Sequence, residues 1–120
     1  MGNESVNSAL EKAIDHIAEQ IKIYRATPFD DGDSLVKVLQ QLTSTLYYLE
    51  GQRSRYHKTW QNTVNNEVLA GNSVSRAENV AHVNTPELYH LRRIMEAGYK
   101  VVDAIRTQIS WLKTEKSSVS

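Results

Sequence analysis

Two stretches of the chain combine basic and aromatic side chains in a way that suits a polyanion. The first is GQRSRYHKTW, which carries Arg53, Arg55 and Lys58 together with Tyr56 and Trp60 and contains no acidic residue. Single-stranded nucleic acid is held by cations that follow its phosphates and by aromatic rings on which its bases stack. The segment therefore predicts a single-stranded nucleic-acid site. The alternative is that Tyr56 and Trp60 continue an apolar helix stripe beside solvated cations.

The second stretch is ELYHLRRIMEAGYKVVDAIRTQISWLK, near the C-terminus, where Arg92, Arg93 and Arg106 fall on one flank of a helix. A basic flank of this length suits several phosphates. Glu96 and Asp103 lie three or four residues from these cations, at the spacing of intrahelical ion pairs. The spacing favours the alternative that much of this flank is a salt-bridged solvent face.

Metal and nucleophile chemistry find little support in the sequence. Glu87 and His90 form one E-x-x-H pair, but di-iron helical bundles need a second pair and two further inward Glu residues. No nucleophile elbow and no Gly-rich phosphate loop is present. We therefore expect neither an enzyme nor a metal or cofactor site.

The composition is that of an ordinary globular domain. The chain has 120 residues, 40% hydrophobic and 23% charged, and no cysteine. It has no apolar run near the roughly 20 residues that a membrane span needs, and no basic and apolar signal segment at its start. We expect a single cytoplasmic domain without a membrane partner; if the protein is phage-encoded, the compartment is the host cytoplasm.

Charge is unevenly spread although the net charge is zero. Residues 1–33 hold seven acidic and three basic residues, whereas residues 34–120 hold seven acidic and eleven basic ones. This asymmetry is compatible with a polyanion partner for the second part, with contacts between copies, or with chance in a short chain.

Helical spacing of apolar residues runs through most of the sequence and predicts an all-α fold. Two long antiparallel helices, an N-terminal helix and a short connecting helix would form a bundle that oligomerisation completes. The expected helices are about 5–26, 34–69, 75–83 and 86–113, in one domain over 1–114 with a frayed tail at 115–120.

The two long helices each carry an apolar seam in steps of three and four, which we expect to form the core and the contacts between subunits. The seam of the helix at 34–69 consists of Leu39, Leu42, Leu46 and Leu49. The seam of the helix at 86–113 consists of Leu91, Met95, Gly98, Val102, Ile105, Ile109 and Leu112. Ile94 and Val101 widen the second seam, which predicts packing against more than one helix. Gly98, in mid-helix, predicts a close approach by a neighbouring helix.

The helix at 34–69 would be about 50 Å long and would outrun the core of a small domain. We expect its second half to project or to pack on another subunit, and whether it is continuous through Gly51 stays open. Asp33 or Ser34 is expected to cap it, Ser75 with Glu78 to form a capping box for the short helix, and Thr85 to cap the last helix.

The segments YYLEGQRSRYHKTW and VVDAIRTQISWLK, with the loop and short helix between them, resemble phage recombination mediators of the UvsY type over residues 35–113. Members of that family form helical homo-oligomers that bind single-stranded DNA and help load a recombinase onto strands covered by single-strand-binding protein. The acidic first helix and TPFDDGD have no counterpart. The resemblance implies DNA contacts at Arg53, Arg55, Tyr56, Lys58 and Trp60, and further contacts at Arg92, Arg93 and Arg106.

Two other functions stay open. The chain is alternatively a protein-binding module, such as a phage anti-defence inhibitor or an assembly adaptor, in which Asp30, Asp31 and Asp33 imitate nucleic acid. A helical scaffold without another role is the third reading.

Overall fold

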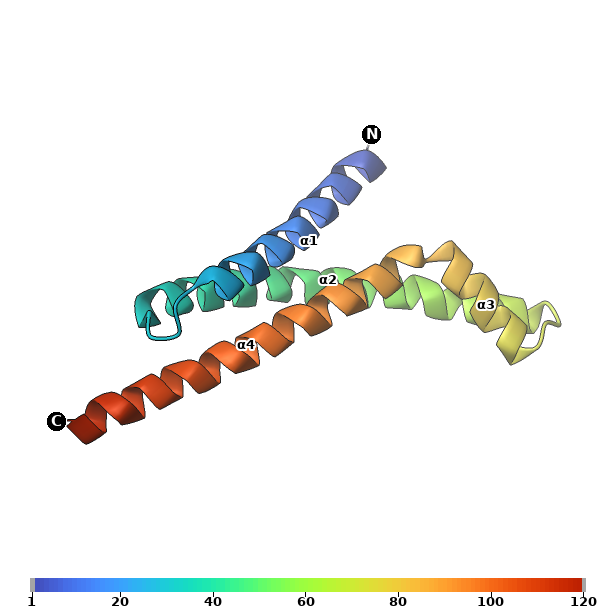
Figure 1. Ribbon diagram of the computed structural model, residues 1–120. Coiled ribbons are helices and arrows are strands. Elements are labelled where there is room, and N and C mark those ends of the chain that lie inside the picture. The colour runs from blue at the N-terminus through green and yellow to red at the C-terminus, as the bar shows by residue number, and fades with distance from the viewer. Residues whose placement is uncertain (1, 120) are drawn as a thin grey trace.

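The structure is a computed structural model that describes residues 2–119 and, among these, the side chains of residues 8–115. It consists of four helices, α1 (Gly2–Ala26), α2 (Gly32–Leu69), α3 (Val74–Asn84) and α4 (Pro86–Val119), without a strand in the described part of the chain. The all-α prediction is confirmed. Figure 1 shows α2 as the central helix, with α1 and α4 packed along its first half and α3 folded back over its far end. The molecule is elongated, with extents of 69 × 32 × 19 Å.

The apolar seams of α2 and α4 form the core, together with Leu10 and Ile17 of α1. Most seam residues are buried, while those towards the ends of the seams are partly buried and pack against the cluster. The buried members are Leu42, Leu46, Leu49, Leu91, Met95, Val102 and Ile105, and the partly buried ones are Leu39, Ile109 and Leu112.

Gly98 marks the closest approach of the helices. A Cβ atom placed at Gly98 would lie 3.1 Å from Cδ2 of Leu46 in α2 and 3.4 Å from Cγ2 of Ile17 in α1. The predicted close approach is therefore correct and involves two helices at once. Ile94 and Val101 are partly buried against the core, as the wide stripe predicted.

The second half of α2 is continuous with the first and is covered within the same chain. Gly51 is helical, and a Cβ at this position would meet nothing within 4 Å. Beyond it α3 packs on α2 through Ala77 and Ala81, both 0% exposed. The second half of α2 therefore does not project uncovered, because two small side chains let α3 lie close against it. Packing on another subunit stays a prediction.

The cap of α2 lies earlier than predicted. Asp31, not Asp33 or Ser34, is the N-cap: its carboxylate accepts from the Ser34 backbone N–H at 3.1 Å and from the Ser34 hydroxyl at 2.7 Å. The hydroxyl of Ser34 and its backbone N–H, in this order, lower the pKa of Asp31, with a smaller contribution from Lys37. The helix begins at Gly32 because the Asp31 side chain satisfies donors of its first turn.

The cap of α3 is also shifted. Ser73 rather than Ser75 accepts from the backbone N–H of Arg76, at 3.2 Å. Gly71 ends α2 with a φ of 101°, a conformation that glycine adopts without strain, so the chain re-enters a helix at Val74. Ser75 therefore lies inside the first turn of α3.

The junction between α3 and α4 and the end of α4 differ from expectation as well. The Thr85 hydroxyl donates to the carbonyl oxygen of Ala81 at 2.6 Å, so it closes α3 instead of capping α4. At the other end α4 reaches Val119, beyond the predicted end near residue 113, and the expected frayed tail is helical up to Val119. No glycine or proline follows Gly98 to interrupt it. Ser120 lies outside the described residues.

Candidate nucleic-acid interface

The basic and aromatic segment 51–60 is divided between two faces of α2. Arg53, Tyr56 and Trp60 recur at helical spacing on the side that meets α3 and α4, and each is partly buried. Arg55 and Lys58 are exposed on the opposite side. The segment therefore does not act as one surface, and its five candidate residues need separate assignment.

Arg53 is engaged by a carboxylate that immediately precedes the segment. Its guanidinium lies 3.1 Å from Oε2 of Glu50, while the other oxygen of Glu50 accepts a hydrogen bond from the Tyr99 hydroxyl of α4 at 2.8 Å. The Tyr99 hydrogen bond, followed by Arg53, lowers the pKa of Glu50. Arg53 thus belongs to a contact between α2 and α4. Segment 51–60 itself holds no acidic residue, but the Glu50 carboxylate just before it pairs with the Arg53 guanidinium.

Tyr56 and Trp60 follow the alternative, in which they continue the apolar stripe. Tyr56 packs against the core, and burial raises the pKa of its hydroxyl. The Trp60 ring stacks on His57 at 5.7 Å between ring centroids and contacts His82 of α3 at 5.6 Å. Its Nε1 is buried without a hydrogen-bond partner in the described structure. Rings held between helices in this way are not free to stack on bases.

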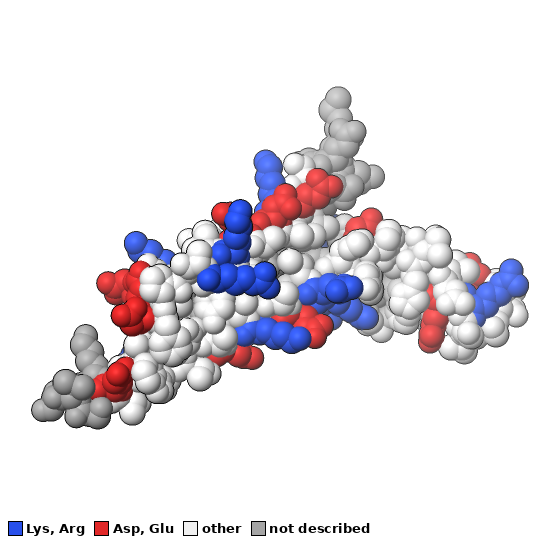
Figure 2. Space-filling view, viewed as in Figure 1, with Lys and Arg blue, Asp and Glu red and all other residues white. Residues whose placement is uncertain are grey.

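The basic flank of α4 is largely occupied by its own neighbours. Arg92 lies 3.4 Å from Nδ1 of His57, and Arg93 donates to the Tyr89 hydroxyl at 3.0 Å with its guanidinium 5.7 Å from the centre of that ring. Lys100 pairs with Glu96 at 3.5 Å. Figure 2 shows positive and negative side chains interleaved over this side of the molecule. These contacts favour the solvent-face interpretation of this flank.

Arg106 is separate from Arg92 and Arg93. It is exposed and lines a shallow hollow near the C-terminal end of α4 with Thr107, Ser110 and Trp111. Trp111 makes an edge contact with Phe29 of the α1–α2 turn at 5.3 Å. Arg106 is therefore not brought together with the cations of segment 51–60.

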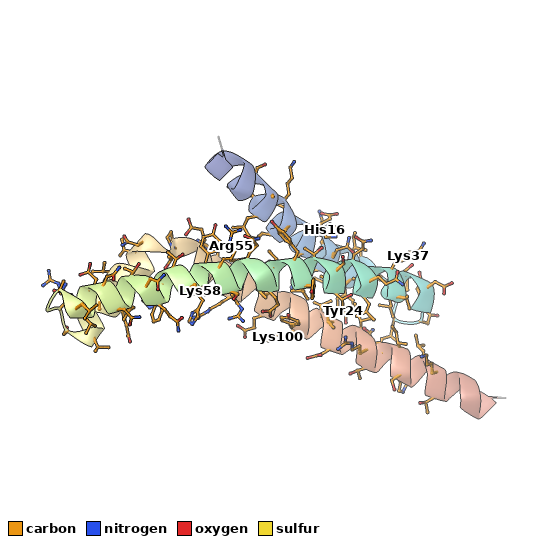
Figure 3. All side chains as sticks on the ribbon, turned by 180° about the vertical axis from the view of Figure 1, so that it is seen from behind. His16, Tyr24, Lys37, Arg55, Lys58 and Lys100 are labelled. Atoms are coloured by element: carbon orange, nitrogen blue, oxygen red, sulfur yellow. The ribbon has the colours of Figure 1, made fainter. Side chains whose placement is uncertain are left out.

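The outward face of α2 carries Arg55 and Lys58, which are free of such contacts. Figure 3 looks onto α2 with the other helices behind it and labels Lys37, Arg55 and Lys58 along its length. The exposed residues at helical spacing on this face are Lys37, Gln40, Ser44, Tyr47, Tyr48, Gly51, Arg55, Lys58 and Asn62, and we call them the outer strip. The distance from Lys37 to Lys58 is about 30 Å along the helix.

Between Lys37 and Asn62 the outer strip holds no carboxylate, although exposed Asp33, about one turn before Lys37, continues its spacing. Of the acidic residues in α2, Asp33 precedes the strip, Glu50 is bound to Tyr99, and Glu67 accepts a hydrogen bond from the Asn72 side chain. Arg55 and Lys58 form no ion pair with any side chain that the structure describes. The strip is consequently a one-sided positive surface on a chain whose net charge is zero.

The sequence-based site did not include the basic residue and the two aromatic residues of the strip that lie outside segment 51–60. Lys37, Tyr47 and Tyr48 lie outside segment 51–60, but they continue the spacing of Arg55 and Lys58 towards the start of α2. Positions 37, 44, 48, 51, 55 and 58 follow one another in steps of seven, four, three, four and three. The signal in the sequence is this helical repeat along a polar face of α2, beside the repeat of the apolar seam.

The Glu87 and His90 pair lies near the start of α4. Glu87 and His90 line a hollow between α1 and α4 with Glu11, yet no group of three or more possible metal ligands occurs in the described part. No described helix is long and apolar enough to cross a membrane. Comparison with protein-family models, curated sequences and solved structures gave no match.

Proposed function

We propose that the protein is a non-enzymatic, homo-oligomeric binder of single-stranded nucleic acid and that the strand lies along the outer strip of α2. The observation that carries this proposal is the pair Arg55 and Lys58, exposed and unpaired on the part of the α2 face, residues 37–62, that holds no carboxylate. Phosphates gain most from cations that no protein carboxylate already neutralises.

Oligomerisation would supply the affinity that one strip lacks. A single chain offers few free cations, whereas linked copies convert later contacts into intramolecular ones and raise the overall affinity. Apolar side chains at the far end of the molecule support self-association: Val68, Leu69, Val74 and Val83 are 41%, 85%, 59% and 78% exposed. Val68, Leu69 and Val74 flank the loop between α2 and α3, beyond the strip's cations along α2, whereas Val83 lies in the last turn of α3.

The biological role that we attach to this binding comes from the resemblance to phage recombination mediators. Under this proposal the protein is phage-related, acts in the cytoplasm of the host, and assists loading of a recombinase on single-stranded DNA. The outer strip provides the strand contact that such a role needs.

A protein-binding role is the second candidate, and the outward face of α1 favours it. Glu11, Asp15 and Glu19 are exposed there, so α1 presents a negative surface to a basic partner. The two functions predict different pull-downs: nucleic acid for the first, and a host or phage protein without nucleic acid for the second.

The test of the proposed function uses two pairs of cations with the same spacing. Arg55→Ala with Lys58→Ala changes the strip, while Lys22→Ala with Arg25→Ala removes the same two charge types from exposed positions of α1. Binding of a fluorescent oligo-dT strand is measured by anisotropy between about 50 and 200 mM salt.

We expect wild-type binding to weaken steeply with salt, and the slope of log K against log salt to fall by about 0.7 for each strip cation removed. The α1 pair should retain at least half of the wild-type affinity. If the wild-type protein does not bind the strand, or if both pairs of substitutions weaken binding equally, the proposal is wrong.

A further inference from the structure

Tyr47 and Tyr48 are large aromatic residues outside the core, and Tyr47 is almost uncovered by the fold. Tyr47 is 85% exposed and Tyr48 39% exposed. Neither ring makes a ring contact, and neither hydroxyl a hydrogen bond, with a side chain that the structure describes. By comparison, the Tyr24 hydroxyl donates to Gln108 at 2.9 Å and that of Tyr99 to Glu50 at 2.8 Å. Neither tyrosine belongs to the core cluster, and no polar contact in the described structure accounts for either hydroxyl.

The residues between the two tyrosines on the helix surface are small. Adjacent residues diverge by about 100° around a helix, so Tyr47 and Tyr48 stand on the two sides of the outer strip. Ser44 lies between these sides about one turn before them and Gly51 about one turn after them, and both are exposed. A strand on the strip would therefore pass between two rings and over small residues.

Gly51 itself has no packing explanation. A Cβ at this position would meet nothing within 4 Å, whereas one at Gly98 would press on Leu46 and Ile17. Glycine in a helix interior costs about 1 kcal/mol relative to alanine. One established use of glycine is to let a ligand approach the backbone closely, and Gly51 stands between the tyrosines and Arg55.

We infer that Tyr47 and Tyr48 stack on unpaired bases while Arg55 and Lys58 hold the adjoining phosphates, so that the outer strip selects single strands over duplex. This inference rests on the proposed function. Tyr48 and Arg55 are about 10 Å apart along the helix, which places a base contact and a phosphate contact on neighbouring nucleotides. Bases in a duplex are stacked on each other and leave no face free for the tyrosine rings.

The experiment compares three ligands and three variants by fluorescence anisotropy at one salt concentration. The ligands are an oligo-dT strand, an abasic strand of the same length and a duplex of the same length. The variants are Tyr47→Ala with Tyr48→Ala, Tyr47→Phe with Tyr48→Phe, and, as a control on α4, Tyr89→Ala, whose side chain is 59% exposed.

We expect the double alanine variant to lose roughly 100-fold in affinity for oligo-dT, or about tenfold for each ring, and to bind the abasic strand and the duplex like wild type. The double phenylalanine variant keeps both rings and should stay within about twofold of wild type for oligo-dT. The Tyr89→Ala variant should match the wild-type protein on all three ligands.

Two measurements keep the outcome interpretable. Circular dichroism checks the fold, and Tyr47→Ala alone replaces the double variant if the more buried Tyr48 proves necessary for stability. Sedimentation measures the assembly, which should be unchanged, and a smaller assembly in the alanine variant would place the tyrosines in a subunit contact and overturn the inference.

An equal loss on oligo-dT and the abasic strand, or no loss on either, would also overturn it, since stacking requires bases. These outcomes differ from failure of the proposed function, in which the wild-type protein itself does not bind oligo-dT.

Discussion

Leu46 of α2 and Gly98 of α4 lie so close that a Cβ at Gly98 would be 3.1 Å from Cδ2 of Leu46. Leu46 is 2% exposed, and Ile17, the other neighbour, is 0% exposed. Both side chains belong to the packed core, so either can give way only by displacing its neighbours. The glycine therefore fixes the distance at which three helices meet.

This contact predicts opposite effects of alanine at the two mid-helix glycines. Gly98→Ala should lower the free energy of unfolding by about 1 kcal/mol, because overpacking outweighs the gain in helix propensity. Gly51→Ala, which meets no neighbour, should raise it by about 1 kcal/mol. Urea unfolding followed by circular dichroism measures both. In a Leu46→Ala background the Gly98→Ala change should become stabilising, and an unchanged sign there would refute the contact as the cause.

Tyr99 and Glu50 predict a pH-dependent contribution to stability. The Tyr99 hydrogen bond is the main cause that lowers the pKa of Glu50 below its ordinary value of 4.5. A lowered folded-state pKa stabilises the fold above the unfolded value, and this stabilisation is lost as pH falls through the folded value. Tyr99→Phe should thus reduce the unfolding free energy by about 1 kcal/mol at neutral pH.

The difference in unfolding free energy between Tyr99→Phe and wild type should shrink as pH falls below the ordinary Glu50 pKa. It should be lost once pH passes the lower folded-state pKa, where the folded carboxylate becomes protonated. Urea unfolding at a series of pH values tests this. A difference that stays constant through the acid range would show that the hydrogen bond to the Glu50 carboxylate is not its origin.

The Trp60→Phe substitution should change neither the stability nor the oligo-dT affinity of the protein by much. Trp60→Phe removes a buried N–H that lacks a partner, which offsets the smaller area of the new ring. We expect the free energy of unfolding to change by less than about 1 kcal/mol and affinity for oligo-dT to stay within about twofold. Anisotropy and urea unfolding on the same sample give both values, and a large loss of affinity with an intact fold would restore Trp60 to the site.

The helices and the core were predictable because apolar seams repeat every three or four residues over long stretches. Leu42, Leu46 and Leu49 face Leu91 and Met95 as those seams require. The caps were harder to predict, since serine and aspartate occur at several adjacent positions and only the backbone geometry selects Asp31 and Ser73.

The candidate site was less predictable, since it depended on which neighbour covers each face of α2. Trp60 is enclosed because α3 returns over it, and Arg53 is engaged because Tyr99 brings α4 to Glu50. Both contacts join residues far apart in the sequence. The spacing of the outer strip can be found in the sequence. Its exposure follows only from the structure, because α1, α3 and α4 cover the other faces of α2.

The central claim is that a single strand lies along the outer strip of α2, and ultraviolet cross-linking tests it most directly. Oligo-dT is cross-linked to the wild-type protein, and the modified peptides are identified by mass spectrometry. We predict cross-links within residues 37–62, concentrated at Tyr47 and Tyr48. Cross-links confined to α1, or to α4 around Arg92, Arg93 and Arg106, would contradict the account.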